Sequence, residues 1–154
     1  MNDTASSYNK PDWFTQNVMN PAVAGLTRIG LPVLGSRVVE VTGRKSGLPR
    51  RTPVNLLEVD GQGYLVAPRG ETEWVRNARA DGNRVVLIKG RRRSAHVLVE
   101  VEGVDKTALL RAYLKRWKFE VGMFFNGVGP ESTDEELAAE AVRHPVFRLQ
   151  SASA

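Results

Sequence analysis

The sequence contains no cysteine and only two histidines, His96 and His144, in 154 residues. The lack of cysteine excludes disulfides, thiol nucleophiles and metal sites with thiolate ligands. Two histidines are too few for most histidine-based metal centres, so we predict no metal ion. A serine triad is not predicted either, because neither histidine has a suitable neighbour and no Gly-x-Ser-x-Gly motif is present. We therefore assign no catalytic residue.

Long uninterrupted apolar runs are also missing. The most apolar stretch, residues 18–34, contains Asn20, Pro21, Arg28 and Pro32, so it is too broken and too short to span a bilayer. The N-terminus lacks the basic, apolar and small-residue order of a signal peptide. We expect a cytoplasmic protein, in which an amphipathic N-terminal helix either packs on the fold or makes peripheral contact with a membrane.

Aromatic residues are scarce, at 7%, whereas hydrophobic residues in total make up 42% of the chain. The second value is ordinary for a globular protein, so a real core is expected. The net charge of +5 favours anionic partners such as phosphorylated cofactors, nucleic acids or lipid surfaces. The basic run Lys89–Arg93 has no aromatic residue within it to stack on bases, so nucleic acid is not a predicted partner.

Short Val- and Leu-rich segments bounded by turn residues predict strands. These lie at 37–41, 54–59, 64–67, 83–89 and 93–102, with a sixth at 146–149. Helical spacing and capping signals predict helices. These lie within 11–29 with a break at Pro21, at 73–80 after Thr72, at 105–118 with Asp105 as the cap, and after the capping boxes in 132–136. Alternation along the fifth strand places Val97 and Val99 on one face, and we expect His96 on the outer face.

Five or six short strands joined by hairpins, with helices at the periphery, predict a mainly β fold of the α+β class built on a small antiparallel barrel. A parallel doubly wound sheet would need helices between its first strands, which this sequence lacks. No linker or repeat divides the chain, so a single domain is predicted over 1–154. Its parts are an N-terminal helical segment at 1–35, a barrel core at 36–102, and C-terminal helices with the last strand at 103–154.

A segment rich in cations and glycine separates the first two predicted strands: Thr42-Gly-Arg-Lys-Ser-Gly-Leu-Pro-Arg-Arg-Thr-Pro53. Its glycines let the backbone bend and approach a ligand closely. Backbone amides beside cationic side chains form a concave anion site. The cations are Arg44, Lys45, Arg50 and Arg51. A solvated hairpin loop explains the same residues without a ligand, and the residues alone leave both interpretations open.

Because no residue set for direct acid–base or nucleophilic chemistry stands out, we predict chemistry carried by a bound cofactor. The cations of this segment, together with Arg69, would hold the phosphate and carboxylate groups of a long anionic cofactor. A flat ring would then lie against the backbone around Pro53, Ala67 and Pro68.

The same segment, followed by Leu65-Val-Ala-Pro-Arg-Gly70 and Trp74-Val-Arg-Asn77, resembles the deazaflavin (coenzyme F420)-dependent nitroreductase family of actinobacteria. The resemblance runs from about Ser36 to Val101. It implies a split β-barrel of the flavin-reductase and pyridoxamine-oxidase type. It also implies binding of coenzyme F420, an 8-hydroxy-5-deazaflavin with a phosphodiester and an oligoglutamate tail, in preference to FMN.

The resemblance implies cofactor-binding roles in three segments. The phosphate and the tail would be held by Gly43, Arg44, Lys45, Ser46, Gly47 and Arg50. The deazaflavin ring would be lined by Thr52, Pro53 and Val54. The second cofactor segment comprises Ala67, Pro68, Arg69 and Gly70, and the helix that follows contributes Trp74 and Asn77.

The implied function is that of an F420H2-dependent reductase. It would transfer a hydride from reduced deazaflavin to a hydrophobic, electron-poor acceptor such as a quinone, an enone or a nitro compound. The alternative is a non-catalytic split-barrel module that binds deazaflavin, FMN or a lipid. We expect a small hydrophobic acceptor as the partner molecule, and a monomer or a homodimer as the assembly.

Overall fold

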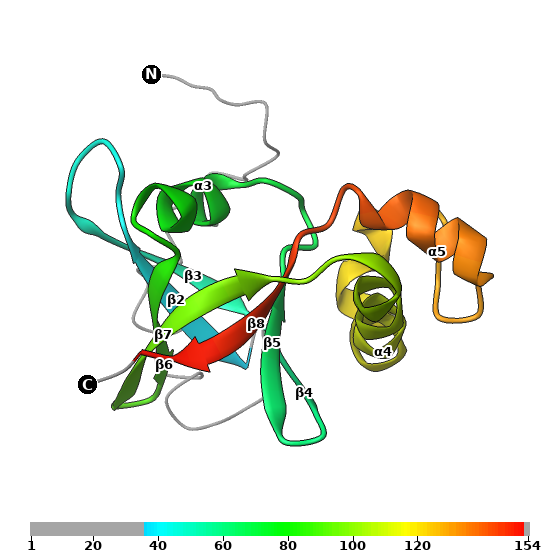
Figure 1. Ribbon diagram of the computed structural model, residues 1–154, viewed down its shortest axis with the longest axis horizontal. Helices are drawn as coiled ribbons and strands as arrows, with labels where there is room; N and C mark the ends of the chain where they lie inside the picture. Colours follow the sequence, from blue (N-terminus) through cyan, green and yellow to red (C-terminus); the bar gives the residue numbers. More distant parts are fainter. Residues whose placement is uncertain (1–35, 153–154) are drawn as a thin grey trace.

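The computed structural model describes residues 36–152, which form one curled antiparallel sheet with helices around it (Figure 1). The strand order is β3-β2-β6-β7-β8-β5-β4. The strands are β2 (Arg37–Thr42), β3 (Pro49–Val54), β4 (Leu56–Val59), β5 (Gln62–Val66), β6 (Arg84–Lys89), β7 (Arg92–Glu100) and β8 (Val146–Ser151). The helices are α3 (Glu73–Ala80), α4 (Gly103–Val121) and α5 (Asp134–Ala141), with a 3-10 turn η1 (Gly122–Phe124). The predicted mainly β fold with peripheral helices is confirmed, while the helices predicted within 11–29 lie outside the described residues.

A single residue, Asn55, separates β3 from β4, and the chain changes its pairing partner there. β3 pairs with β2, whereas β4 pairs with β5, so the two edges of the sheet are consecutive in sequence. Asn55 is buried, and its Nδ2 lies 3.5 Å from Glu120 Oε1 on α4. This change of partner curls the sheet into a half-barrel and leaves it split beside β3.

The loop within the cationic segment is shorter than predicted from the sequence. Residues 49–53 were expected to be loop, but they form most of β3, with Arg50 paired to Val41 and Pro53 paired to Val38. Two prolines argued against a strand there. Their positions are compatible with pairing because β3 is an edge strand of the described sheet, where a missing N–H costs no ladder bond.

One core fills the concave face of the sheet, and α3 closes one end of it. Val39, Val85 and Leu98 are among the strand residues of this core, and Trp74 and Val75 reach it from α3. The Trp74 ring meets Phe147 edge-on at a centroid distance of 6.0 Å. The apolar spacing of α3 thus buries one face, as predicted. Thr72 occupies its N-cap position without a side-chain capping bond.

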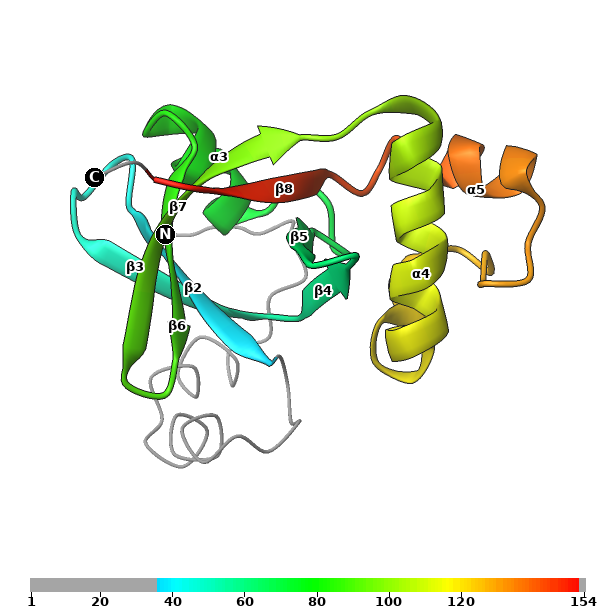
Figure 2. The ribbon, with the colours of Figure 1, turned by 60° about the horizontal axis from the view of Figure 1, so that its bottom comes forward.

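A second core lies on the convex side, where α4 and α5 pack together against β4, β5 and β8 (Figure 2). Leu110 and Tyr113 of α4 are buried there, and burial raises the pKa of the Tyr113 hydroxyl. α4 begins at Gly103, so the predicted cap, Asp105, instead lies in its first turn, where a carboxylate complements the helix dipole. The predicted capping box of α5 is confirmed at Thr133 and Glu136.

His96 faces the interior of the half-barrel, so the prediction that it lies on the outer face is wrong. It pairs with Val85 and stands two residues before Leu98, and both of these are core residues. Side chains two apart on a strand share a face. The alternation itself was read correctly, but Val97 and Val99 form the outward face. Within the part of the chain that the structure describes, no helix is long and apolar enough to cross a bilayer.

We expect Trp74→Ala to lower the free energy of unfolding by about 3–5 kcal/mol, because it empties the contact between α3 and the concave core. Urea denaturation followed by circular dichroism measures this change. The matched control is Phe119→Ala, since Phe119 is 100% exposed and its truncation should change stability by less than about 0.5 kcal/mol. Equal effects of the two substitutions would contradict the assignment of α3 as the closing element.

Candidate functional site

The loop between β2 and β3 is a tight turn over residues 43–48. Gly43 N–H donates to the Leu48 carbonyl and Gly47 N–H donates to the Gly43 carbonyl, both at 2.8 Å. A Cβ on Gly43 would lie 2.7 Å from Ser46 Oγ, and Gly47 has φ +73°. Both positions therefore need glycine for this loop shape.

Arg44 fastens this loop to α3. Its backbone N–H donates to Asn77 Oδ1 at 3.0 Å, and its Nη1 donates to Asn77 Oδ1 and to Glu73 Oε1, both at 2.8 Å. Asn77 is 5% exposed, so its amide oxygen depends on these donors. The contacts bring two predicted site residues together, and they turn the Arg44 guanidinium toward the protein.

The other cations of the segment divide into two kinds. Arg51 Nε donates to Glu40 Oε2 at 2.8 Å, and Arg93 donates to the other oxygen of Glu40 at 2.6 Å. Burial opposes ionisation of Glu40, but the hydrogen bonds from the two arginines outweigh it and lower the pKa of this carboxyl. Lys45 and Arg50 are exposed, and within residues 36–152 neither forms an ion pair.

The donor set at this loop fits the acidic end of F420. Two exposed cations, Lys45 and Arg50, stand at a glycine-containing turn, and such side chains form charge-assisted hydrogen bonds with phosphate and carboxylate groups. Arg44 and Asn77 hold the turn in position from behind. The structure thus separates cations that shape the loop from cations that remain available at its surface.

The second predicted segment, residues 67–70, is fastened to the chain before β8. Ala67 N–H donates to the Pro145 carbonyl at 2.9 Å, and Gly70 N–H donates to the Ala67 carbonyl at 3.1 Å. His144 Nδ1 donates to the Pro68 carbonyl at 2.8 Å. These bonds fix the backbone of the segment although it has no regular secondary structure.

His144 belongs to a buried polar network that the sequence reasoning missed. Its Nε2 lies 2.7 Å from Glu140 Oε2, which also accepts from Asn126 Nδ2 at 3.0 Å, and Phe125 stacks on the ring at 3.9 Å. Burial lowers the pKa of His144, while Glu140 and the Pro68 carbonyl oppose that effect. Glu140 and His144 are one helical turn apart in sequence, and that spacing was the available signal.

Residues of the predicted ring segment, of segment 67–70 and of α3 border one core of the half-barrel. Val54, Ala67 and Trp74 belong to the same concave core, and the Arg69 guanidinium lies 4.9 Å from the centre of the Phe124 ring. Strand alternation separates Thr52 and Val54 from Pro53, which lies on the opposite face. A ligand ring that lies along β3 can therefore contact the backbone of all three residues, but the side chains either of Thr52 and Val54 or of Pro53, not of both sets. Trp74 is a core residue, 6% exposed.

The curled sheet, its split beside β3 and the helix that closes one end define a split barrel of the flavin-reductase type. Solved structures share this fold. One described as an F420-H2 dependent reductase (FDR-A) has a TM-score of 0.52 and 19% identity, covering 74% of this chain and 92% of that chain. A domain-swapped dimer has a TM-score of 0.55 and 19% identity, covering 92% and 100%. The conserved hypothetical protein Rv2991 from Mycobacterium tuberculosis has a TM-score of 0.52 and 13% identity, covering 87% and 81%.

The family model described as F420H(2)-dependent quinone reductase matches residues 13–119. The chain therefore belongs to this family of F420-dependent oxidoreductases, and F420 is its cofactor. A comparison with curated proteins finds no match. The predicted class of enzyme and the predicted cofactor are confirmed, while the individual cofactor-binding residues and the actinobacterial origin stay predictions.

We expect Asn77→Ala to destabilise the protein by about 1–3 kcal/mol, because Arg44 loses two hydrogen bonds to a buried acceptor, each contributing about 0.5–1.5 kcal/mol. Thermal unfolding measures the stability, and hydrogen exchange should show faster exchange of the amides at 43–48. Asn77→Asp is the matched control, since it keeps an acceptor for Arg44 and should preserve slow exchange. If the amides at 43–48 exchange as slowly in Asn77→Ala as in the wild type, the hydrogen bonds between Arg44 and Asn77 do not hold the loop in position.

The ion pair between Arg44 and Glu73 predicts an acid-dependent contribution to stability. The hydrogen bond from Arg44 lowers the pKa of Glu73 below 4.5, so the contribution is present above pH 4.5 and is lost as the pH falls through the lowered pKa. Glu73 is half-exposed, which limits the effect to less than about 1 kcal/mol.

Thermal unfolding of the wild type and of Glu73→Gln, measured from neutral to acidic pH, checks this expectation. The difference in Tm should be largest above pH 4.5 and should shrink below it. Glu131→Gln, at an exposed position without an ion pair among the described residues, serves as the control. A difference in Tm that is independent of pH would contradict the role of the ion pair.

Proposed function

We propose that this protein transfers a hydride from F420H2 to a hydrophobic, electron-poor acceptor of the quinone, enone or nitro class, with quinones favoured by the family description. One observation carries the proposal. In a chain of an F420-dependent family, the cationic loop, residues 67–70 and α3 meet at one end of the half-barrel, and Arg44 joins the loop to α3.

The acidic end of the coenzyme would bind at the loop. Lys45 and Arg50 would contact the phosphate and the tail carboxylates, and each charge-assisted contact contributes about 1.5–3 kcal/mol. Arg44 and Asn77 act indirectly, because their mutual hydrogen bonds set the position of the loop backbone. Gly43, Ser46 and Gly47 shape the turn that presents these two cations.

The ring of the coenzyme would lie between β3 and the segment 67–70. Thr52 and Val54 line this place from the strand, and Ala67, Pro68 and Gly70 line it with backbone that the Pro145 carbonyl and the His144 ring hold in position. When bound, reduced F420 supplies the hydride, and a proton from solvent completes the reduction of the acceptor. The chain contributes position and an apolar surround rather than an acid or a base.

The cationic loop gives this proposal a direct test. Purified protein should oxidise F420H2 in the presence of menadione, followed by the absorbance of the oxidised coenzyme. The double variant Lys45→Glu/Arg50→Glu should bind the coenzyme at least about 100-fold more weakly, because two favourable contacts become repulsive. Its Tm should stay near that of the wild type, since neither side chain is buried.

Lys115→Glu is the matched control, because Lys115 is an exposed cation on α4. It should leave coenzyme affinity unchanged. Unfolding of the double variant would show that the loop cations serve the fold instead. A protein that binds F420 but oxidises F420H2 with no quinone, enone or nitro compound would overturn the proposed reaction while leaving the cofactor site intact.

A further inference from the structure

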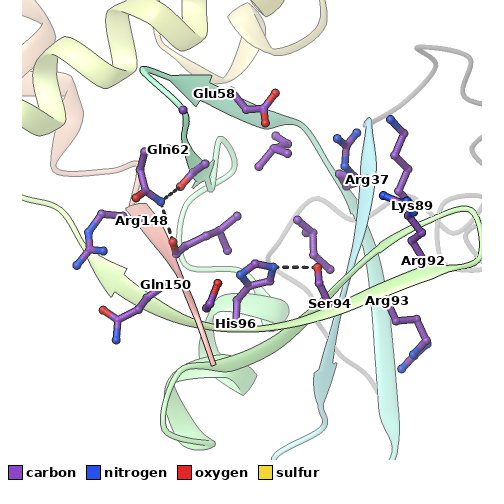
Figure 3. Close-up of a pocket in the computed structure, with 16 residues that line it drawn as sticks. Arg37, Glu58, Gln62, Lys89, Arg92, Arg93, Ser94, His96, Arg148 and Gln150 are labelled. Carbon is purple, nitrogen blue, oxygen red and sulfur yellow. Dashed lines mark hydrogen bonds between the residues drawn. The ribbon is translucent and has the colours of Figure 1, made fainter. Parts of the chain in front are cut away.

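A cavity of ≈ 870 Å³ opens at the end of the half-barrel that lies opposite α3 (Figure 3). Its walls include Arg37 at the start of β2, whereas the loop that follows β2 contacts α3. The two ends of one strand therefore reach two different sites. The volume is in the range of pockets that bind small organic ligands.

Three cations lie in one row across the concave face of the sheet at this mouth. Lys89 of β6 and Arg92 of β7 are direct cross-strand partners, and the pairing of Val38 with Ile88 places Arg37 of β2 beside Lys89. Neighbouring strands are about 4.8 Å apart, and like charges opposite one another are destabilising. Figure 3 shows the three side chains gathered on one side of the cavity.

This row has no internal counter-charge in the described part of the chain. None of its three cations forms an ion pair there, and Glu58 is the one carboxylate among the residues that line the cavity. Arg93, next in sequence to Arg92, also lines the cavity, but its guanidinium is held by Glu40. Glu40 thus neutralises Arg51 and Arg93, whereas no ion pair among the described residues neutralises the row.

The rest of the wall combines apolar and hydrogen-bonding groups. Leu56, Leu87 and Leu149 form an apolar part. His96 Nε2 contacts Ser94 Oγ at 2.9 Å, while its buried Nδ1 has no hydrogen-bond partner among the described residues. A buried ring nitrogen without a partner is costly. A ligand for this wall needs an anionic end for the cations and an apolar body for the leucines.

We propose that this cavity is a second ligand site, which binds an amphiphilic phosphate monoester with its phosphate on Arg37, Lys89 and Arg92 and its apolar part on the leucines. None of its three cations is among the residues proposed to hold F420, although Arg37 pairs with Val54 of the proposed ring site. The phosphate could belong to a soluble metabolite or to a lipid headgroup, because both present the same chemistry to the row.

Calorimetric titration of the full-length protein with hexyl phosphate tests the site. Inorganic phosphate and 1-hexanol, which represent the two halves of this probe, are titrated separately. Hexyl phosphate should bind saturably and more tightly than either half. Lys89→Gln and Arg92→Gln should each weaken it about tenfold, the loss of one charge-assisted contact. Arg91→Gln should leave the affinity for hexyl phosphate unchanged, because Arg91 is an exposed cation of the same hairpin that does not line the cavity.

The two histidines report where the probe binds. Hexyl phosphate should shift the ring proton resonances of His96 and leave those of His144 in place, since His144 lies in the other buried network. Vesicles of phosphatidylcholine with and without phosphatidic acid separate the two sources. If vesicles that contain phosphatidic acid capture the protein, and Lys89→Gln weakens this capture, the ligand is a lipid. If only the soluble probe binds, the ligand is a metabolite.

Three results would overturn the proposal. The first is no saturable binding of hexyl phosphate and no capture by phosphatidic acid vesicles. The second is an equal loss in Arg91→Gln, which indicates only a diffuse positive field. The third is competition between F420 and hexyl phosphate, with coenzyme affinity reduced in Lys89→Gln, which would make the cavity part of the coenzyme site. Failure of the reductase reaction alone leaves this inference standing.

Discussion

The change of pairing partner at Asn55 is the constraint on which the rest of the structure depends. One extended stretch, residues 49–59, pairs with β2 in its first half and with β5 in its second half. This brings the two edges of the sheet together at one point and keeps them apart beyond it. The resulting half-barrel has a concave core, a split beside β3 and two ends. α3 closes one end, and the polar cavity occupies the other.

The positive charge of the chain is divided by the faces of this sheet. On the convex face, Glu40 holds both Arg51 and Arg93, and near α3 the pair of Glu73 and Asn77 holds Arg44. These cations are structural. Among the cations without a carboxylate partner in the described residues are Lys45 and Arg50 at the loop after β2, and Arg37, Lys89 and Arg92 in the row at the cavity.

Local signals predicted most of the elements, because short apolar segments and turn residues act over a few positions. The strand expected at 64–67, helix α3 and the capping box of Thr133 all follow from neighbours in sequence. The cationic segment and residues 67–70 were predicted to bind the cofactor through family resemblance. Their residue-level roles remain predictions. The network of His144 was missed because its partner at Pro68 lies 76 residues away in sequence.

The residues alone indicated the class of fold and the position of a cationic loop, because strand length, turn chemistry and charge depend on consecutive residues, and the family resemblance supplied the cofactor type. Only the tertiary structure decided which side of each strand is the inside. Val97 and Val99 are more apolar than His96 and Ser94, yet the curl of the sheet turns the latter pair inward. Curvature arises from pairing between distant strands, so no local pattern reveals which face becomes concave.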